Sequence, residues 1–175
     1  MREIIYDVTM SSDGFIAPPG ADTGPFACRG PHVSAFLDRL PAYRTTIMGR
    51  SAYRDVAGDG LPIGENPFPF TDCHIVSTTL ALPRNAAVDR ISASQVVELK
   101  LGTGGPIFLS GGGTLAGWLR RRHLIDRLRL TVDPVWLGGG VPLWGEADGS
   151  DLPEGDPIAE HHHPGGVLFR EYRLH

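Results

Sequence analysis

An apolar run that breaks into consecutive glycines and resumes as a helical segment is the feature that most limits the fold of this chain. Residues 106–109 have the composition of a short buried strand, residues 110–114 read Ser-Gly-Gly-Gly-Thr, and residues 115–123 have a helical pattern. Such a turn leaves backbone N–H groups bare, and the helix adds the positive end of its dipole. The turn therefore favours a phosphate group, although a merely tight turn needs glycine as well.

Two further predicted strands end in polar residues. Residues 45–48 lead into Gly49, Arg50 and Ser51, and residues 73–76 lead into Ser77 and Thr78. In open α/β sheets, ligands bind beyond the carboxyl ends of the strands. An arginine can bind a phosphate with two parallel hydrogen bonds, and hydroxyl groups can complete its coordination. Each end alone is also explained by a helix cap, a turn or a surface arginine. Together they favour a ligand with two separated phosphate groups.

The order of the remaining segments predicts an α/β fold. We expect one domain over residues 1–175, with a largely parallel sheet and antiparallel strands near the C-terminal edge. The expected strands are residues 4–9, 15–17, 45–48, 73–77, a short one near Val88, 106–109, 128–136 and 167–174. A helix with Val33, Phe36, Leu37 and Leu40 on its apolar face is expected to end at Pro41, and others are expected after Gly49 and over residues 92–101 and 115–123.

Composition excludes several classes of function. A net charge of −4 argues against general affinity for nucleic acid, and no apolar run is long enough for a membrane span. Two cysteines, Cys28 and Cys73, cannot form a disulfide framework. We expect a cytoplasmic protein. The run from His161 to His163 is expected to be a surface loop without a metal, because adjacent side chains of an extended segment point to opposite sides.

Neither common nucleotide-binding motif occurs in the chain. The sequence has no G-x-x-x-x-G-K-[S/T] motif, and Gly117 comes too late to be the third glycine of a Rossmann fingerprint. If the three strand ends bind a dinucleotide, they do so in another fold.

The order and spacing of several short motifs resemble the dihydrofolate reductase-like superfamily, and within it the branch of the C-terminal reductase domain of riboflavin-biosynthesis proteins. The motifs are residues 12–17 (SDGFIA), 48–51 (MGRS), 75–77 (IVS), 109–115 (LSGGGTL), 124–128 (LIDRL) and 134–144 (PVWLGGGVPLW). The resemblance implies a three-layer α/β/α sandwich with a mixed, mostly parallel central sheet. It also implies NADPH as cofactor, a small-molecule substrate and a homodimer.

The same resemblance assigns residues to the parts of NADPH. Arg50 and Ser51 are expected at the adenosine 2′-phosphate, with Ser77 and Thr78 beside them, and Gly49 is a further residue expected to bind the cofactor. The pyrophosphate is expected on the N-terminus of the helix after the glycine-rich turn, and the nicotinamide at the first strand and the segment that follows it. The residues concerned are Gly111, Gly112, Gly113 and Thr114 for the pyrophosphate, and Thr9, Ile16 and Ala17 for the nicotinamide.

The chain departs from the folate reductases in two places. The threonine that follows their Gly-Arg pair by two positions is replaced by Ala52, and the acid of their first helix falls near Val33 or Ser34. Dihydrofolate reduction is therefore not expected. Asp13 is our candidate for a carboxylate that contacts the substrate or relays a proton, and a plain turn former is the alternative.

Two functions remain open at this point. One is an NADPH-dependent reductase of a small heterocycle or ketone, similar to the pyrimidine reductases of riboflavin biosynthesis. The other is a non-catalytic nucleotide-binding or dimeric scaffold that keeps the fold. Trp144 fits a stacking face at the substrate site and a place in the core equally well.

Overall fold

The architecture is a three-layer α/β/α sandwich around an eight-stranded sheet. The computed structural model describes residues 1–20, 26–58, 60–145, 152–153 and 156–174. The order of strands in the sheet is β5-β4-β3-β6-β1-β7-β10-β9. Their bounds are β1 Ile4–Ser11, β3 Thr45–Gly49, β4 Asp72–Val76, β5 Asp89–Ile91, β6 Ile107–Gly111, β7 Arg127–Asp133, β9 Ala159–His162 and β10 Leu168–Arg173.

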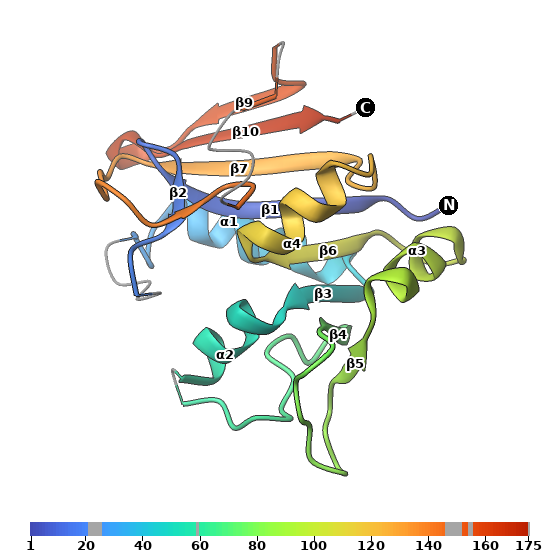
Figure 1. Cartoon of the computed structure of the whole chain (residues 1–175). Helices are drawn as coiled ribbons and strands as arrows, with labels where there is room; N and C mark the ends of the chain where they lie inside the picture. Colours follow the sequence, from blue (N-terminus) through green and yellow to red (C-terminus); the bar gives the residue numbers. More distant parts are fainter. Residues whose placement is uncertain (21–25, 59, 146–151, 154–155, 175) are drawn as a thin grey trace.

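The sheet is parallel except at its C-terminal edge, as predicted. The six strands from β5 to β7 run in one direction, and β10 pairs antiparallel with both β7 and β9. A second small sheet joins β2 (Phe15–Ala17) to β8 (Val141–Pro142). The carboxyl ends of the parallel strands lie on the left in Figure 1, where β2 also lies.

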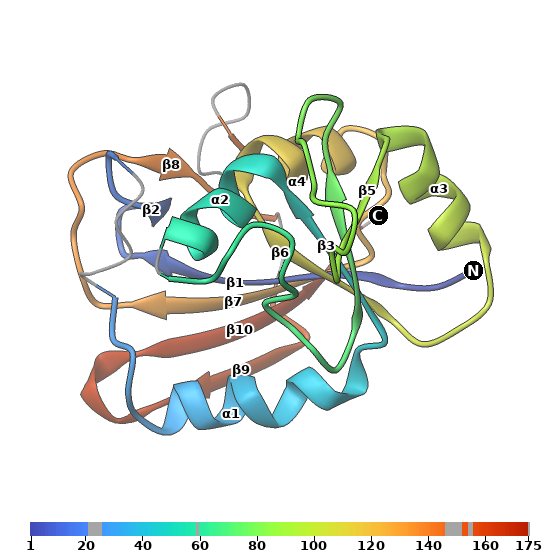
Figure 2. The same cartoon turned by 90° about the horizontal axis from the view of Figure 1, so that it is seen from below.

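Helices cover both faces of the sheet. The helix α1 (Pro31–Arg39) lies on one face, while α3 (Ala93–Leu101) and α4 (Gly113–Arg120) lie on the other (Figures 1 and 2). The helix α2 (Arg50–Gly58) follows β3, and two 3₁₀ turns cover Leu40–Ala42 and Pro164–Gly166.

Because side chains alternate along each strand, neighbouring residues of one strand pack in separate clusters of the core. Tyr6 of β1 is fully buried in the largest cluster, together with Ala116 and Leu119 of α4. The adjacent Ile5 packs in a separate cluster with Leu40, at the end of α1. Because successive side chains of a strand point to opposite faces, one buried strand serves both layers of helices.

Three local predictions were wrong. Leu37 was expected on the buried face of α1, but its side chain is 55% exposed. Trp136 was expected inside a strand, but β7 ends at Asp133. His161 and His162 were expected in a loop, but they belong to the edge strand β9, which the sequence analysis did not predict. An edge strand faces water on one side, so it accepts polar residues that do not look like a strand.

Helix ends also differ from the prediction. The first helix ends at Arg39, and Pro41 lies inside the 3₁₀ turn that follows. The helix after the glycine-rich turn begins at Gly113 rather than Leu115, and ends before His123, whose φ of 53° is in the left-handed region. Within the described part of the chain, no helix is long and apolar enough to cross a bilayer.

The two thiols should differ sharply in reactivity. Cys73 is buried, and burial raises the pKa of its thiol to about 12, whereas Cys28 is exposed. Because the thiolate is the nucleophile, we expect 5,5′-dithiobis(2-nitrobenzoate) to titrate one thiol per native chain rapidly and the second only in denaturant. Cys28→Ser should remove the fast phase, and a fast phase that survives in this variant would contradict the assignment.

Candidate cofactor-binding site

The sheet places the three polar strand ends next to one another. The strand β3 is central, with Gly49 paired to Val76 of β4 and Met48 paired to Gly111 of β6. Gly49 is also close to the glycine-rich turn, since a Cβ built on it would lie 3.6 Å from the amide nitrogen of Gly112. The juxtaposition expected from the sequence is therefore present, although the roles of the individual residues toward a cofactor stay predictions.

The glycine-rich turn has open space beside two of its glycines. Gly111 has a φ of 127°, which favours glycine, and a Cβ built on it meets no atom within 4 Å. The nearest atom to a Cβ on Gly112 is Cβ of Ala52, at 4.0 Å. The turn thus leaves space against bare backbone, which is what close approach of a phosphate group requires.

The N-terminus of α4 has no side-chain cap. Gly112 is its N-cap residue and makes no side-chain hydrogen bond, and Thr114 is exposed in the first turn. In contrast, α3 closes its own N-terminus with a complete capping box formed by Ser92 and Gln95. The first amide groups of α4 therefore remain available to a ligand, and the helix dipole favours an anion there.

The Arg50 side chain spans two strand ends. Arg50 and Ser51, both exposed, begin α2, and Nη1 of Arg50 donates a hydrogen bond to Oγ1 of Thr79, in the turn after β4. Ser77 Oγ shapes that turn by accepting hydrogen bonds from the backbone amides of Thr79 (3.1 Å) and Leu80 (3.0 Å). The cation is therefore held near the turn, and contacts with the described residues leave part of its hydrogen-bonding capacity unused.

Thr79 is a residue of this group that the sequence analysis did not single out. Thr78, which it did, is also exposed, but the hydrogen bond of Arg50 goes to Thr79. The available signal was the run of three hydroxyl residues after the strand, but only the turn made by Ser77 decides which of them faces Arg50.

The carboxylate of Asp13 joins two loops at the same edge. Its two oxygens accept hydrogen bonds from the backbone amides of Leu137 (3.1 Å) and Gly138 (2.7 Å). A hydrogen bond from Ser11 and these amides lower the pKa of Asp13. Because both oxygens are occupied by backbone amides of the second loop, the geometry favours a role of Asp13 in fixing that loop. Its contact with a substrate remains a prediction.

The residues predicted for the nicotinamide lie on β1 and β2. Thr9 is half-buried on β1, and Ile16 and Ala17 are half-buried on β2. The backbone at Gly140 packs tightly on β2, because a Cβ on Gly140 would lie 2.0 Å from the carbonyl oxygen of Ala17. A residue with a Cβ atom therefore does not fit at position 140.

A buried ion pair lies on the α1 side of β1. The carboxylate of Asp7 has 1% of its surface exposed and forms two hydrogen bonds of 3.0 Å with the Arg39 guanidinium. Tyr43 also donates to it (3.3 Å). Desolvation raises the pKa of Asp7 and the arginine opposes the shift. Asp7 is thus a buried carboxylate two residues before Thr9 on β1, and the sequence analysis missed it. The sequence feature that could have indicated Asp7 is a charged residue within the apolar run of the first strand.

Trp144 belongs to the core. The side chain is 1% exposed, its ring centroid lies 5.6 Å from that of Tyr6, and the guanidinium of Arg120 covers it at 4.7 Å. Of the two roles left open by the sequence, the structure shows core packing.

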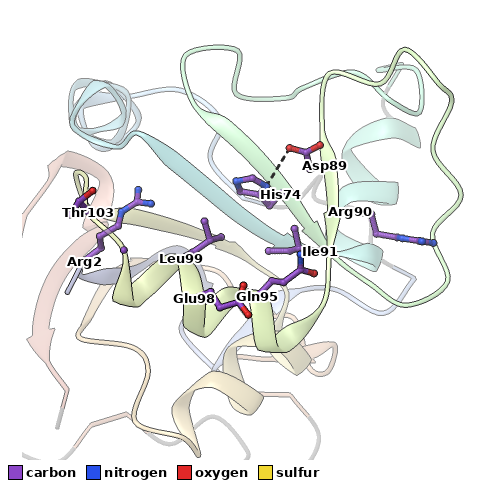
Figure 3. A pocket seen from close by; sticks show the side chains of 10 residues that line it. Arg2, His74, Asp89, Arg90, Ile91, Gln95, Glu98, Leu99 and Thr103 are labelled. Carbon is purple, nitrogen blue, oxygen red and sulfur yellow. Dashed lines mark ion pairs between the residues drawn. The ribbon is translucent and has the colours of Figure 1, made fainter.

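A pocket of about 540 Å³ lies elsewhere, between α3 and the outer strands β4 and β5 (Figure 3). His74 and Asp89 face each other in it, with 3.7 Å between Nδ1 and the carboxylate. Burial lowers the pKa of His74, although Asp89 and Asp72 oppose the shift. Arg2 and Thr103 line the pocket near the amino ends of β1 and β6, so it is not part of the group of strand ends.

Solved structures share this fold over nearly their whole length. A putative riboflavin biosynthesis protein from Shewanella sp. PV-4 superposes with a TM-score of 0.77 at 21% identity, covering 100% of both chains. A pyrimidine reductase-like protein from Corynebacterium diphtheriae gives 0.72 at 16% identity, over 99% of this chain and 92% of that one. Dihydrofolate reductase from Enterococcus faecalis, complexed with NADP(H), gives 0.67 at 14% identity, over 98% and 95%. The fold is that of the dihydrofolate reductase-like proteins.

Sequence comparison narrows the class to one family. The model of the RibD C-terminal domain matches residues 2–152, and the chain belongs to this family. Two relatives from Bacillus subtilis (strain 168) are the uncharacterized proteins YyaP, 30% identical over 155 residues (82% of this chain, 80% of YyaP), and YwjB, 27% identical over 151 residues (83% and 84%).

Proposed function

We propose that this protein is an NADPH-dependent reductase of a small heterocyclic substrate. The observation that carries the proposal is the meeting of three strand ends that offer an uncapped helix N-terminus, an arginine and hydroxyl groups to one ligand. Two of the fold neighbours are a pyrimidine reductase-like protein and a dihydrofolate reductase, which supports an oxidoreductase.

The residues present fit the cofactor. The open turn at Gly111 and Gly112 and the first amides of α4 would hold the pyrophosphate, with Thr114 at its edge. Arg50 and Ser51 would hold the 2′-phosphate. When bound, NADPH supplies a hydride, and the protein's part is to orient the two rings and exclude water between them.

A homodimer and a cytoplasmic location complete the proposal. The resemblance supports the homodimer, and the presence of only two cysteines supports the cytoplasmic location. The competing function is a nucleotide-binding scaffold without turnover, and one observation favours it. The first turn of α1 carries no acidic residue, so this turn offers no proton donor of the folate-reductase type.

Calorimetric titration with NADPH tests the proposal most directly. We expect saturable heat at micromolar cofactor together with quenching of tryptophan fluorescence. Oxidation of NADPH at 340 nm with pterin, pyrimidine and flavin-precursor substrates then separates the reductase from the scaffold. No heat and no quenching at millimolar NADPH would rule out both the cofactor and the reductase.

A further inference from the structure

Trp136 is the most exposed of the described phenylalanine, tyrosine and tryptophan residues. Its exposed fraction is 80%, whereas Trp144 is buried and Trp118 is partly buried beneath the guanidinium of Arg122, 4.0 Å from its ring. A single exposed apolar side chain is common on protein surfaces and by itself indicates nothing. The backbone and the position of Trp136 are what distinguish it.

The backbone on both sides of Trp136 is fixed. We call residues 134–140 the 134–140 arm. Before the tryptophan, the Val135 carbonyl accepts a hydrogen bond of 2.9 Å from the amide of Ser12. After it, Asp13 accepts from the next two amides, and Gly140 is pressed against β2. A loop anchored this way presents its indole at little cost in conformational entropy.

The 134–140 arm connects the predicted nicotinamide residues with the glycine-rich turn. It leaves β7 at Asp133, which pairs with Ser11 at the carboxyl end of β1. The segment after it reaches the start of α4, where a Cβ on Gly113 would lie 2.4 Å from the Pro142 carbonyl oxygen. The connection between β7 and β8 lies at the same end of the molecule as β2 and the start of α4 (Figures 1 and 2).

We propose that Trp136 stacks on the substrate and that the substrate therefore carries a planar, conjugated ring. An indole offers a broad flat face and loses little freedom when it stacks, so it selects flat rings over puckered ones. This inference rests on the proposed function, because the same edge is the one that would hold the cofactor.

The test compares a flat and a puckered ring on the NADP⁺ complex. Lumazine (flat) and 5,6-dihydrouracil (saturated) are titrated calorimetrically into protein saturated with NADP⁺. We expect Trp136→Ala to weaken lumazine binding at least fivefold and Trp136→Phe less than threefold. Trp118→Phe is the matched control and should bind like the wild type, and dihydrouracil should bind weakly to all four proteins.

The outcomes separate this inference from the proposed function. Loss of NADP⁺ binding in the wild type would overturn both. NADP⁺ binding with equal lumazine affinity in wild type and Trp136→Ala, or with no lumazine binding by the wild type, would overturn the stacking role alone. A dimer that becomes monomeric in Trp136→Ala on gel filtration, with lumazine affinity unchanged, would assign the indole to a second copy of the chain.

Discussion

Arg50→Ala is expected to weaken NADPH binding by roughly 10- to 100-fold while changing NADH binding less than about threefold. A hydrogen bond to a charged group contributes about 1.5–3 kcal/mol, and each 1.4 kcal/mol is about tenfold in affinity. Only NADPH carries the 2′-phosphate that Arg50 is proposed to bind. Calorimetric titration of both cofactors measures the difference directly.

Arg173→Ala is the matched control for Arg50. Arg173 is also exposed, but it ends β10 near the C-terminus, at the opposite end of the sheet from the carboxyl ends of the parallel strands. It removes the same charge and should leave both affinities unchanged. Equal losses for NADPH and NADH in Arg50→Ala would show that this arginine does not bind the 2′-phosphate.

Gly113→Ala is expected to destabilise the fold by about 3 kcal/mol, because its new Cβ would lie 2.4 Å from the carbonyl oxygen of Pro142 and 2.9 Å from the amide nitrogen of Gly145. Both atoms belong to the backbone, so no rotamer change can relieve the contact. The melting temperature should fall by roughly 10 °C. Differential scanning calorimetry of the apoprotein measures this without any cofactor.

Gly49→Ala serves as the comparison for Gly113→Ala. A Cβ on Gly49 would meet its nearest neighbours at 3.6–3.8 Å, which is ordinary van der Waals contact. Its melting temperature should therefore stay within about 2 °C of the wild type. If the melting temperature of Gly113→Ala is as high as that of Gly49→Ala, the segment over residues 142–145 does not pack against the start of α4 as described.

The parallel part of the sheet was predictable because the sequence patterns that indicate its strands are local. The composition of the sequence is enough to predict the apolar strands that lead into Gly49, Ser77 and Gly111. Parallel neighbouring strands then bring their carboxyl ends to the same edge of the sheet. The helix α1 shows the limit of such patterns. Arg39 pairs with Asp7 and so turns toward the sheet, and a position two residues earlier lies about 200° around the helix. This rotation leaves Leu37 in water.

The sequence by itself determined which backbone segments are bare, charged or hydroxyl-rich, because glycine, arginine and serine have those properties in any context. Only the tertiary structure decided which of these groups meet. Thr79 rather than Thr78 contacts Arg50 because Ser77 folds the turn, and Asp13 holds the 134–140 arm from more than a hundred residues away. The free energy that selects these contacts comes from packing across the whole sheet, so no local pattern can specify them.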